Sequence, residues 1–378
     1  HNNSITNTSR SNHCNFNRIL TRANDAKENT EQAKEDELRQ LTAIEAATNL
    51  EDTTYTDNST GEEKTIKIPA QTAVSQIEGE NTLKDGLVII DKNRNEWIWI
   101  EVPKSIFDNE EYYTNGATKP TSSEDYTNIE KIMQNYASKY RESGYTDIWD
   151  SEAQHGFANA TEYNNHKNVM LKSIYENGGF YIGRYEVGSF DNPVTSNNNT
   201  RTPVLQEGAY PYNFVTCKQA QELSESLSIG EKTSSLMLGI QWDLVLVYLE
   251  ESGVSEEDLK TSSGSWGNYN NVSFDITKGK YSTNRGQSYT PVNETYLKPA
   301  SDVLLTTGAT KRNSKINVYD LAGNVWEWTL EKGIYSSNQC VHRGGCYNSE
   351  ESNNLASYRI ANSTSLNNST TGFRPVLY

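Results

Sequence analysis

Two carboxylates flank a tight turn in the stretch Asp320-Leu-Ala-Gly-Asn-Val-Trp-Glu-Trp328. Gly323 and the asparagine after it are the residue types that most easily take positive φ, so they predict the turn. Asp320 and Glu327 lie on either side of it, near main-chain carbonyls that a turn leaves free. Hard cations are bound by side-chain and main-chain oxygens together. We therefore predict a calcium site from Asp320, Gly323, Val325 and Glu327. The alternative is a buried turn whose carboxylates face water.

A second group of chemically useful side chains lies between residues 333 and 371, which are rich in Asn and Ser. Tyr, Ser and Asn combine rigid contact area with adaptable hydrogen bonding, as binding surfaces do. The alternative is that such loops simply cover a chain of low hydrophobicity. The predicted ligand-binding residues are Tyr335, Asn338, His342, Tyr347, Asn348, Asn353, Asn354, Ser357, Asn362, Asn367 and Asn368.

Catalytic arrangements are weakly represented. The five histidines are isolated, and the chain has no phosphate-binding loop, zinc-ligand spacing or nucleophile elbow. His342 beside Arg343 would suit a general base for a nearby cysteine, but an ordinary strand residue is the simpler interpretation. A carboxylate pair that binds a cation is not free to shuttle protons. We favour a protein that is not an enzyme, and the question stays open.

Composition excludes several classes of protein. The chain has 378 residues and a net charge of −16, so it carries no basic surface for nucleic acid. It has no apolar run long enough to cross a membrane and no visible signal peptide. Hydrophobic residues make up only 34%, whereas aromatic residues reach 10%, which predicts a core of amphipathic rings.

Four cysteines, Cys14, Cys217, Cys340 and Cys346, are too few and too scattered for a disulfide framework. Only Cys340 and Cys346 are close enough in sequence to suggest a local bridge. Free cysteines are at least as consistent with the spacing.

The chain divides into four parts by composition. Residues 1–18 are polar without periodicity and are predicted to be disordered. Residues 19–47 have a thin apolar stripe at helical spacing and predict a solvated or lightly packed helix. Residues 48–84 are acidic and rich in threonine, which we interpret as a linker. The globular domain is predicted to span residues 85–378.

Within that domain the pattern alternates between strands and helices. Residues 86–90, 96–101 and 178–187 read as strands. Apolar residues from Ile129 onward share one helical face. Thr216 and Gln219 have capping-box spacing and open a further helix, and another helix is expected over residues 239–249.

Three blocks carry a resemblance to a known family. Asp320-Leu-Ala-Gly-Asn-Val-Trp-Glu-Trp328, Arg343-Gly-Gly345 and Gly372-Phe-Arg374 resemble, in the same order, the signature blocks of the formylglycine-generating enzyme (sulfatase-modifying factor) family. The resemblance covers roughly residues 85–378. It implies an α+β, C-type-lectin-like domain with much irregular structure and often bound calcium, here preceded by an N-terminal helix. Ser265-Trp-Gly-Asn268 resembles another family loop, and Asn270, Asn271 and Asp275 after it are candidates for a second cation site.

The resemblance does not extend to the family's chemistry. The family oxidises a substrate cysteine with copper and oxygen, using two cysteines five residues apart. Aligned on Arg359, the later cysteine falls on Ile360 and the earlier one near Leu355 or Ala356. Soft sulfur ligands are what select Cu(I), so we do not expect copper. A formylglycine-generating-type oxidoreductase, or another enzyme on the same fold, is kept as an alternative.

The C-terminal segment has a second resemblance. Asn, Ser, Thr, Tyr, His and Cys are among the residues reached when adenines of an asparagine codon are replaced. Their enrichment after residue 333, and the ending Gly372-Phe-Arg-Pro-Val-Leu-Tyr378, resemble the variable proteins of diversity-generating retroelements. This implies a non-catalytic protein that binds an unidentified protein or glycan through a variable segment. A fixed structural or adhesion module is the alternative.

The segment from Ile19 to Lys27 resembles the region that follows the apolar anchor helix of prepilin-like surface proteins. The resemblance implies an extracellular or cell-surface location, on a bacterium or a phage. Contact with a membrane is expected only through such an anchor, which the given sequence does not include.

Overall fold

The computed structural model describes residues 34–35, 37–38, 41–47, 49–193, 196–197, 200–335 and 338–378. The predicted disorder of residues 1–18 and most of the predicted helix 19–47 lie outside these residues. The described part of that helix is helical at residues 34–35, 37–38 and 41–46, and Ala43 and Ala47 are buried against the domain. No helix among the described residues combines the length and the apolar character needed to cross a membrane.

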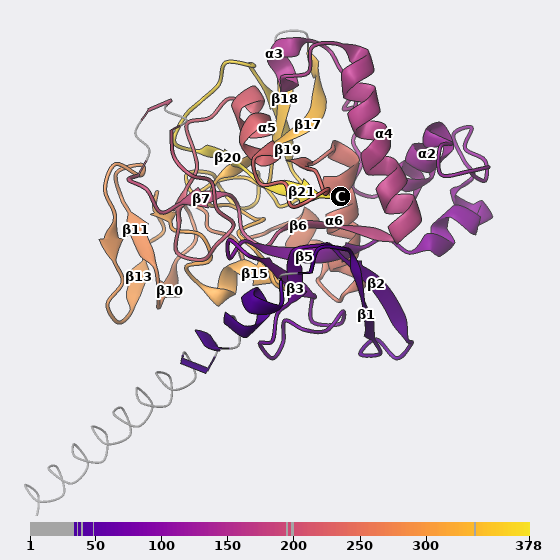
Figure 1. The fold of residues 1–378 in the computed structure, drawn as a ribbon. Coiled ribbons are helices and arrows are strands. Elements are labelled where there is room, and N and C mark those ends of the chain that lie inside the picture. Colours follow the sequence, from indigo (N-terminus) through magenta and orange to yellow (C-terminus); the bar gives the residue numbers. More distant parts are fainter. Residues whose placement is uncertain are drawn as a thin grey trace, which may run out of the picture.

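A six-stranded antiparallel sheet forms the centre of the domain (Figure 1). Its order is β3 (Thr72–Val74), β4 (Val88–Asp91), β5 (Glu96–Glu101), β6 (Gly179–Gly183), β21 (Pro375–Leu377) and β9 (Ser234–Leu236). Every residue of β6 is buried, because helices and loops cover both faces of the sheet. The last strand of the chain thus lies between two strands formed much earlier, which ties the C-terminus to the core.

Helices pack around this sheet. They are α2 (Tyr126–Tyr136), α3 (Glu152–His155), α4 (Ala160–Asn177), α5 (Cys217–Glu225), α6 (Gly239–Glu251) and α7 (Glu256–Lys260), with single-turn 3₁₀ helices η1 (Lys104–Asp108), η2 (Glu110–Tyr112) and η3 (Lys311–Asn313). The capping box predicted at Thr216 and Gln219 is formed at the start of α5. Helix α6 is buried from Gly239 to Leu249, as expected for a helix that is apolar on all sides.

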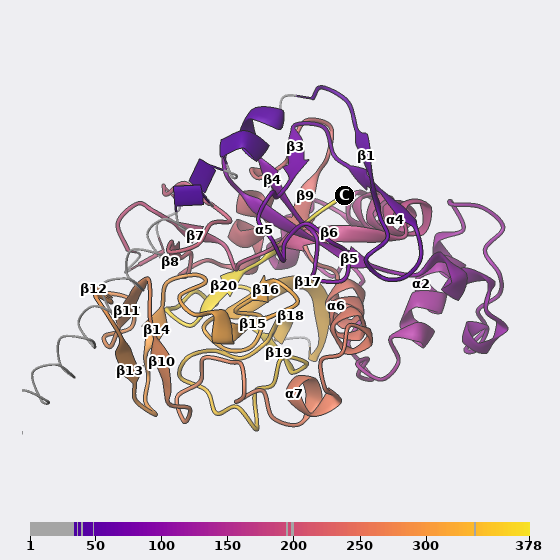
Figure 2. The ribbon, with the colours of Figure 1, turned by 90° about the horizontal axis from the view of Figure 1, so that it is seen from below.

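A second, four-stranded sheet carries the C-terminal segment (Figure 2). Its order is β19 (Arg359–Asn362), β18 (Asn338–Arg343), β17 (Trp326–Tyr335) and β20 (Thr371–Phe373). Strands β17 and β20 are parallel, and the other pairs are antiparallel. The two tryptophans of β17, Trp326 and Trp328, point to one face and are buried, as their spacing predicted.

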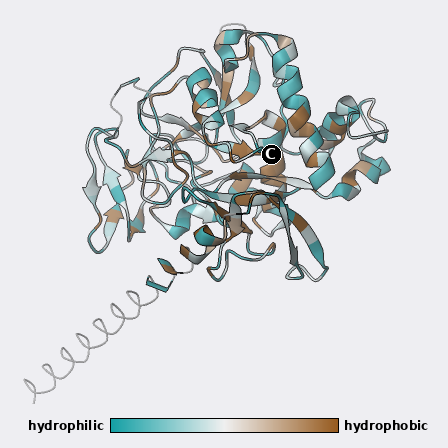
Figure 3. Cartoon of the chain, in the orientation of Figure 1, coloured by the Kyte–Doolittle hydropathy of each residue, from teal (hydrophilic) through white to brown (hydrophobic). Residues whose placement is uncertain are grey.

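The remaining strands are short and form small separate sheets. They are β7 (Gly188–Ser189) with β8 (Tyr210–Pro211), β10 (Phe274–Ile276) with β13 (Tyr296–Lys298), β11 (Lys280–Ser282) with β12 (Thr290–Pro291) and β14 (Leu304–Leu305), and β15 (Ser314–Lys315) with β16 (Val318–Tyr319). The α+β class with much irregular structure is therefore confirmed. Hydrophobic residues gather toward the middle of the molecule (Figure 3).

The prediction that residues 48–84 form a linker is wrong. They form the hairpin of β1 (Thr53–Asp57) and β2 (Lys64–Ile68), followed by β3 of the central sheet. Ile66, Ile68 and Leu83 are part of the main core. The stretch Lys64-Thr-Ile-Lys-Ile68 alternates polar and apolar residues, which is the strand signal, but the acidic composition concealed it. The domain therefore begins before residue 85.

Candidate functional site

The C-terminal segment alternates buried anchors with exposed side chains. In β19, Arg359 and Ala361 are buried, whereas Ile360 is 36% exposed and Asn362 is half-buried. A strand turns successive side chains to opposite faces, so one face enters the core and the other faces outward. The loops on either side are mostly exposed or half-buried and do not show this alternation. Of the predicted binding residues, Asn348 and Asn353 are exposed, and Asn354, Ser357, Asn362, Asn367 and Asn368 are half-buried.

Two predicted binding residues instead belong to the interior. His342 is 3% exposed and Tyr347 is 1% exposed, so neither contributes to an exposed face. His342 lies opposite Trp328 in the β17–β18 register and stacks on both tryptophans of β17, with ring centroids 4.6 Å from Trp326 and 5.0 Å from Trp328. Burial lowers the pKa of His342 to about 3. Its Nε2 lies 2.8 Å from the Asn362 amide, which faces outward above it.

Tyr347 is held by a hydrogen bond of 3.1 Å between its hydroxyl and that of Ser369. The remaining two predictions, Tyr335 and Asn338, lie opposite each other where β17 ends and β18 begins. Their side chains lie outside the described part of the structure.

Two exposed residues escaped the sequence analysis, Tyr358 and Ile360. They are 38% and 36% exposed and flank the buried Arg359. The Tyr358 ring centroid is 6.1 Å from that of Trp326, so the exposed ring adjoins the buried aromatic stack. The two residues on either side of Arg359 in a strand are expected to face away from it, which could have predicted their exposure. The prediction considered polar residues and therefore missed them. We name Asn348, Asn353, Tyr358, Ile360 and Asn362 the C-terminal face.

Beneath this face lies a largely buried ionic network, in which the Arg141 side chain is 14% exposed. Asp243 of α6 accepts hydrogen bonds from three guanidinium groups, those of Arg343 at 2.8 Å, Arg359 at 2.7 Å and Arg141 at 2.8 Å. Glu331 of β17 pairs with Arg343 and Arg359, each at 3.3 Å. Charged hydrogen bonds of this kind fix geometry as well as contributing energy. The network therefore ties β17, β18 and β19 to α6.

The network is balanced in charge. Asp147 lies 4.0 Å from Arg141 and accepts backbone hydrogen bonds of 2.5 and 3.0 Å from Gly239 and Ile240 at the start of α6. Three arginines therefore face three buried acids, Asp147, Asp243 and Glu331, and the mostly exposed Glu142 lies 3.7 Å from Arg359. Burial raises the pKa of Glu331 and of Asp147, while the neighbouring arginines act in the opposite direction. Such a balanced cluster suits a rigid support more than a reacting centre.

The turn that the sequence singled out forms a second ionic centre. Gly323 and Asn324 adopt positive φ of 75° and 57°, as predicted. Glu327 makes a bidentate pair with Arg374, with Nε–Oε2 and Nη2–Oε1 distances of 3.0 and 2.7 Å. Arg374 also donates to the carbonyls of Gly183 at 2.8 Å and Tyr319 at 2.7 Å. The arginine thus uses both oxygens of Glu327.

Two oxygens in this centre lack any partner among the described residues, Asp320 Oδ1 and Glu186 Oε2. Asp320 Oδ2 accepts a hydrogen bond of 2.7 Å from the backbone N–H of Gly308. Glu186 Oε1 accepts one from the side-chain amide of Asn324. Burial raises the pKa of Asp320 to about 6 and raises that of Glu186 well above its usual value, to which the Asp320 carboxylate contributes. Glu186 was not among the residues predicted for this centre.

The predicted calcium ligands fit this geometry only in part. Asp320 offers an unpartnered buried oxygen, which a cation would satisfy, and Glu186 offers another. Glu327 is instead taken up by Arg374. The described residues contain no cluster of three or more His, Cys, Asp and Glu side chains arranged to hold a metal ion. The site of Asp320, Gly323, Val325 and Glu327 therefore stays a prediction, with Glu186 as an added candidate ligand.

The described cysteines are all buried and free. Cys340 donates to the Gln154 carbonyl at 3.3 Å and Cys346 to the Asn348 side chain at 3.0 Å, so the suggested local bridge is not formed. Burial raises the pKa of Cys217 well above its usual value, and the neighbouring Cys340 thiol raises it further. The positions that align with the family's catalytic cysteines are Leu355, Ala356 and Ile360, which have no thiol.

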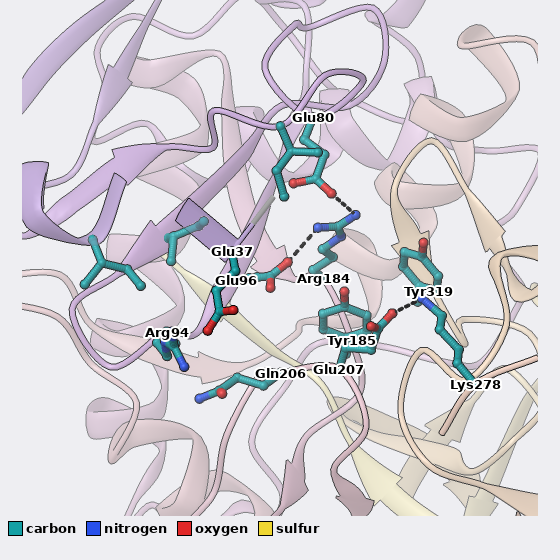
Figure 4. A pocket seen from close by; sticks show the side chains of 13 residues that line it. Glu37, Glu80, Arg94, Glu96, Arg184, Tyr185, Gln206, Glu207, Lys278 and Tyr319 are labelled. Carbon is teal, nitrogen blue, oxygen red and sulfur yellow. Dashed lines mark hydrogen bonds and ion pairs between the residues drawn. The ribbon is translucent and has the colours of Figure 1, made fainter. Parts of the chain in front are cut away.

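A cleft of about 530 Å³ lies on another side of the domain (Figure 4). In its wall, Arg184 bridges Glu80 at 2.7 Å and Glu96 at 2.6 Å, and Lys278 pairs with Glu207. The acids and bases of the wall are thus largely matched with one another. The sequence analysis did not single out this cleft.

The chain belongs to the family described as sulfatase-modifying factor enzyme 1-like domain, whose match covers residues 154–377. No curated protein sequence matches the chain. Among solved structures it is similar to CarF, at 14% identity and a TM-score of 0.31 over 52% of this chain and 85% of that chain. It is similar to PvdO from Pseudomonas aeruginosa, at 13% identity and a TM-score of 0.30 over 53% of this chain and 81% of that chain. Treponema denticola variable protein 1 is 14% identical, with a TM-score of 0.23 over 86% of this chain and 98% of that chain.

Proposed function

We propose that this chain is a non-catalytic binding protein that holds a protein or glycan ligand on its C-terminal face. The observation that carries the proposal is the alternation of buried anchors and exposed Asn, Tyr and Ile side chains along one segment of chain. Exposed aromatic and aliphatic residues beside amides provide both apolar contact and adaptable hydrogen bonds.

The support beneath the face favours binding by a rigid surface. Apart from the Asn362 amide and the Tyr358 ring, no side chain of the C-terminal face contacts the stack of Trp326, His342 and Trp328 or the network around Asp243 among the described residues. Because these anchors define the backbone, outward side chains can change with little effect on folding. This arrangement suits a segment that differs between copies of the gene.

The same proposal includes location and cofactor. The resemblance of residues 19–27 to prepilin-like proteins supports secretion or display on a cell or phage surface. Calcium would be held by Asp320, with the carbonyls of Gly323 and Val325, and its role would be to stabilise the turn below the sheet. An oxidoreductase on the same fold remains the alternative of a different class.

A pair of matched variants tests the binding proposal. The first is Asn348→Ala/Asn353→Ala/Ile360→Ala on the C-terminal face. The control is Asn164→Ala/Asn165→Ala/Val169→Ala on an exposed part of α4. It removes two asparagine side chains and one β-branched aliphatic side chain, as the first variant does, and valine is one carbon shorter than isoleucine. Both variants and the parent are applied to a glycan microarray and to an array of extracellular protein domains.

We expect the first variant to lose the parent's signal, the control to keep it, and both to unfold within about 1 kcal/mol of the parent. If the control loses the signal equally, or the first variant keeps it, the C-terminal face is not the binding site. Whether the face varies is decided separately by sequencing the 3′ end of the gene in its source population. Substitutions confined to exposed positions, with Gly344, Gly345 and Arg374 invariant, support a variable binder, and an invariant segment supports a fixed module.

A further inference from the structure

We propose that the Lys298 ammonium group is a built-in cation that fills a cage of backbone carbonyls and thereby positions residues 348–351 of the chain without a metal ion. The relevance of residues 348–351 to binding rests on the function proposed above. The cage itself rests on independent contacts.

The cage is made by main-chain oxygens alone. Lys298 is the last residue of β13 and is 0% exposed to solvent. Its Nζ donates to the carbonyls of Tyr269 and Val272, both at 2.8 Å, of Pro299 at 3.0 Å and of Ser301 at 3.2 Å. An ammonium group has three donors, so four acceptors satisfy it completely.

The environment of Lys298 differs from that of an ordinary buried lysine. Lys298 forms no ion pair among the described residues, although the Asp302 carboxylate is near enough to raise its pKa, whereas buried lysines are usually paired. The Phe274 ring adds a cation–π contact, with its centroid 5.4 Å from Nζ. Burial lowers the pKa of Lys298 to about 8, which keeps the group protonated at pH 7. Carbonyl oxygens converging on one positive charge are the environment that proteins build for hard cations.

This arrangement overturns the hypothesis that Asn270, Asn271 and Asp275 form a second cation site. Asp275 is exposed on β10. The carbonyls on either side of the two asparagines, those of Tyr269 and Val272, already bind the ammonium group. A metal ion and the ammonium group cannot occupy the same cage.

The two asparagines instead bind the C-terminal segment. The Asn270 backbone amide donates to the Ser349 carbonyl at 3.0 Å, and its side-chain amide donates to the Asn348 carbonyl at 3.1 Å. The Asn271 side chain accepts from the Glu351 amide at 3.3 Å and donates to the Glu351 carboxylate. Lys298 binds the residues just before and just after this pair, so it holds both ends of the loop that shapes residues 348–351.

The test uses the full chain and hydrogen–deuterium exchange read by mass spectrometry. Lys298→Met keeps the length of the side chain and removes its charge. We expect exchange of the amides in residues 269–272 and 348–351 to rise at least about tenfold, with the six-stranded sheet unchanged. Lys280→Met is the control, because Lys280 Nζ donates to a tyrosine hydroxyl at 2.7 Å outside the cage. We expect no change at residues 269–272 or 348–351 in the control.

A second arm keeps the proposal testable if Lys298→Met does not fold. The Asp320→Asn variant, which lacks the calcium ligand proposed beside the Gly323 turn that pairs with Asn268, is measured in EDTA and in millimolar calcium, and exchange at residues 269–272 should be equal in the two buffers. Faster exchange in EDTA that calcium reverses would show that a metal ion holds this loop, and would overturn the proposal. Unchanged exchange in a folded Lys298→Met variant would do so as well. Neither readout uses the protein or glycan ligand of the C-terminal face, so failure here is distinct from failure of the binding proposal.

Discussion

Replacing Asp243 by asparagine removes one charge from the network beneath the C-terminal face while keeping the size of the side chain. Asp243 is fully buried and accepts from three arginines at 2.7–2.8 Å. After the change, three guanidinium groups would face only two buried acids, Asp147 and Glu331, besides the mostly exposed Glu142 near Arg359. One positive charge would remain in the core without a buried counter-charge.

The expected loss of stability is large. Breaking a buried ion pair by removing one partner costs about 3–5 kcal/mol, because the partner is left desolvated. Unfolding entropy is about 2.1 cal/mol/K per residue, so for a domain of roughly 300 residues this corresponds to about 5–8 °C in Tm. The control is Glu250→Gln in the same helix. Glu250 is partly exposed and binds Lys139 and Tyr140 at the surface, where such pairs contribute up to about 1 kcal/mol.

Urea unfolding followed by tryptophan fluorescence and circular dichroism measures both variants against the parent. We expect Asp243→Asn to lower the free energy of unfolding by at least about 3 kcal/mol and Glu250→Gln by no more than about 1 kcal/mol. Equal losses in the two variants, or a loss below about 1 kcal/mol for Asp243→Asn, would refute the idea that this network supports the second sheet.

Three further outcomes follow from the same structure. Trp326→Ala should cost about 3–5 kcal/mol as a large-to-small change in the buried stack, and a loss below about 1 kcal/mol would show that this ring is not part of the core. Calcium should raise the Tm of the parent by more than that of Asp320→Asn, because a ligand that binds only the native state stabilises it; an equal response of the two proteins would contradict the proposed site. The folded-state pKa of His342, about 3, lies below the unfolded value of about 6.5, so its contribution to stability is complete above pH 6.5 and is lost as the pH falls toward 3. His342→Gln should therefore reduce the slope of unfolding free energy against pH by about 1.4 kcal/mol per unit in that range, and parallel curves would argue against a buried neutral histidine.

Features that depend on neighbouring residues were predictable. The capping box at Thr216, the positive φ of Gly323 and Asn324, and the shared face of Trp326 and Trp328 each follow from a rule that spans a few residues. The strands at residues 86–90 and 96–101 were placed to within about two residues. The strand expected over residues 178–187 ends at Gly183, because irregular pairings with distant loops replace the ladder after it.

The same approach failed where composition conflicted with periodicity. Residues 48–84 are acidic, but their alternating apolar residues form a hairpin that joins the core. In the C-terminal segment, polarity suggested that His342 and Tyr347 face a ligand. The strand register instead places His342 over the tryptophans, and Tyr347 reaches Ser369. A polar side chain that finds a hydrogen-bond partner can be buried at modest cost, so polarity alone did not decide exposure.

The sequence by itself determined the family, the order of its three blocks, the absence of thiols at the aligned catalytic positions, and the local turn and caps. Only the tertiary structure decided the partners of the charged groups. It brought Glu186 beside Asp320, paired Glu327 with Arg374, and placed Lys298 in a cage of carbonyls. Local rules act through the backbone of adjacent residues, whereas these partners are far apart in sequence and meet only when the sheets pack. Burial then requires each charge to find an opposite charge or a full set of hydrogen bonds, and the fold selects which one.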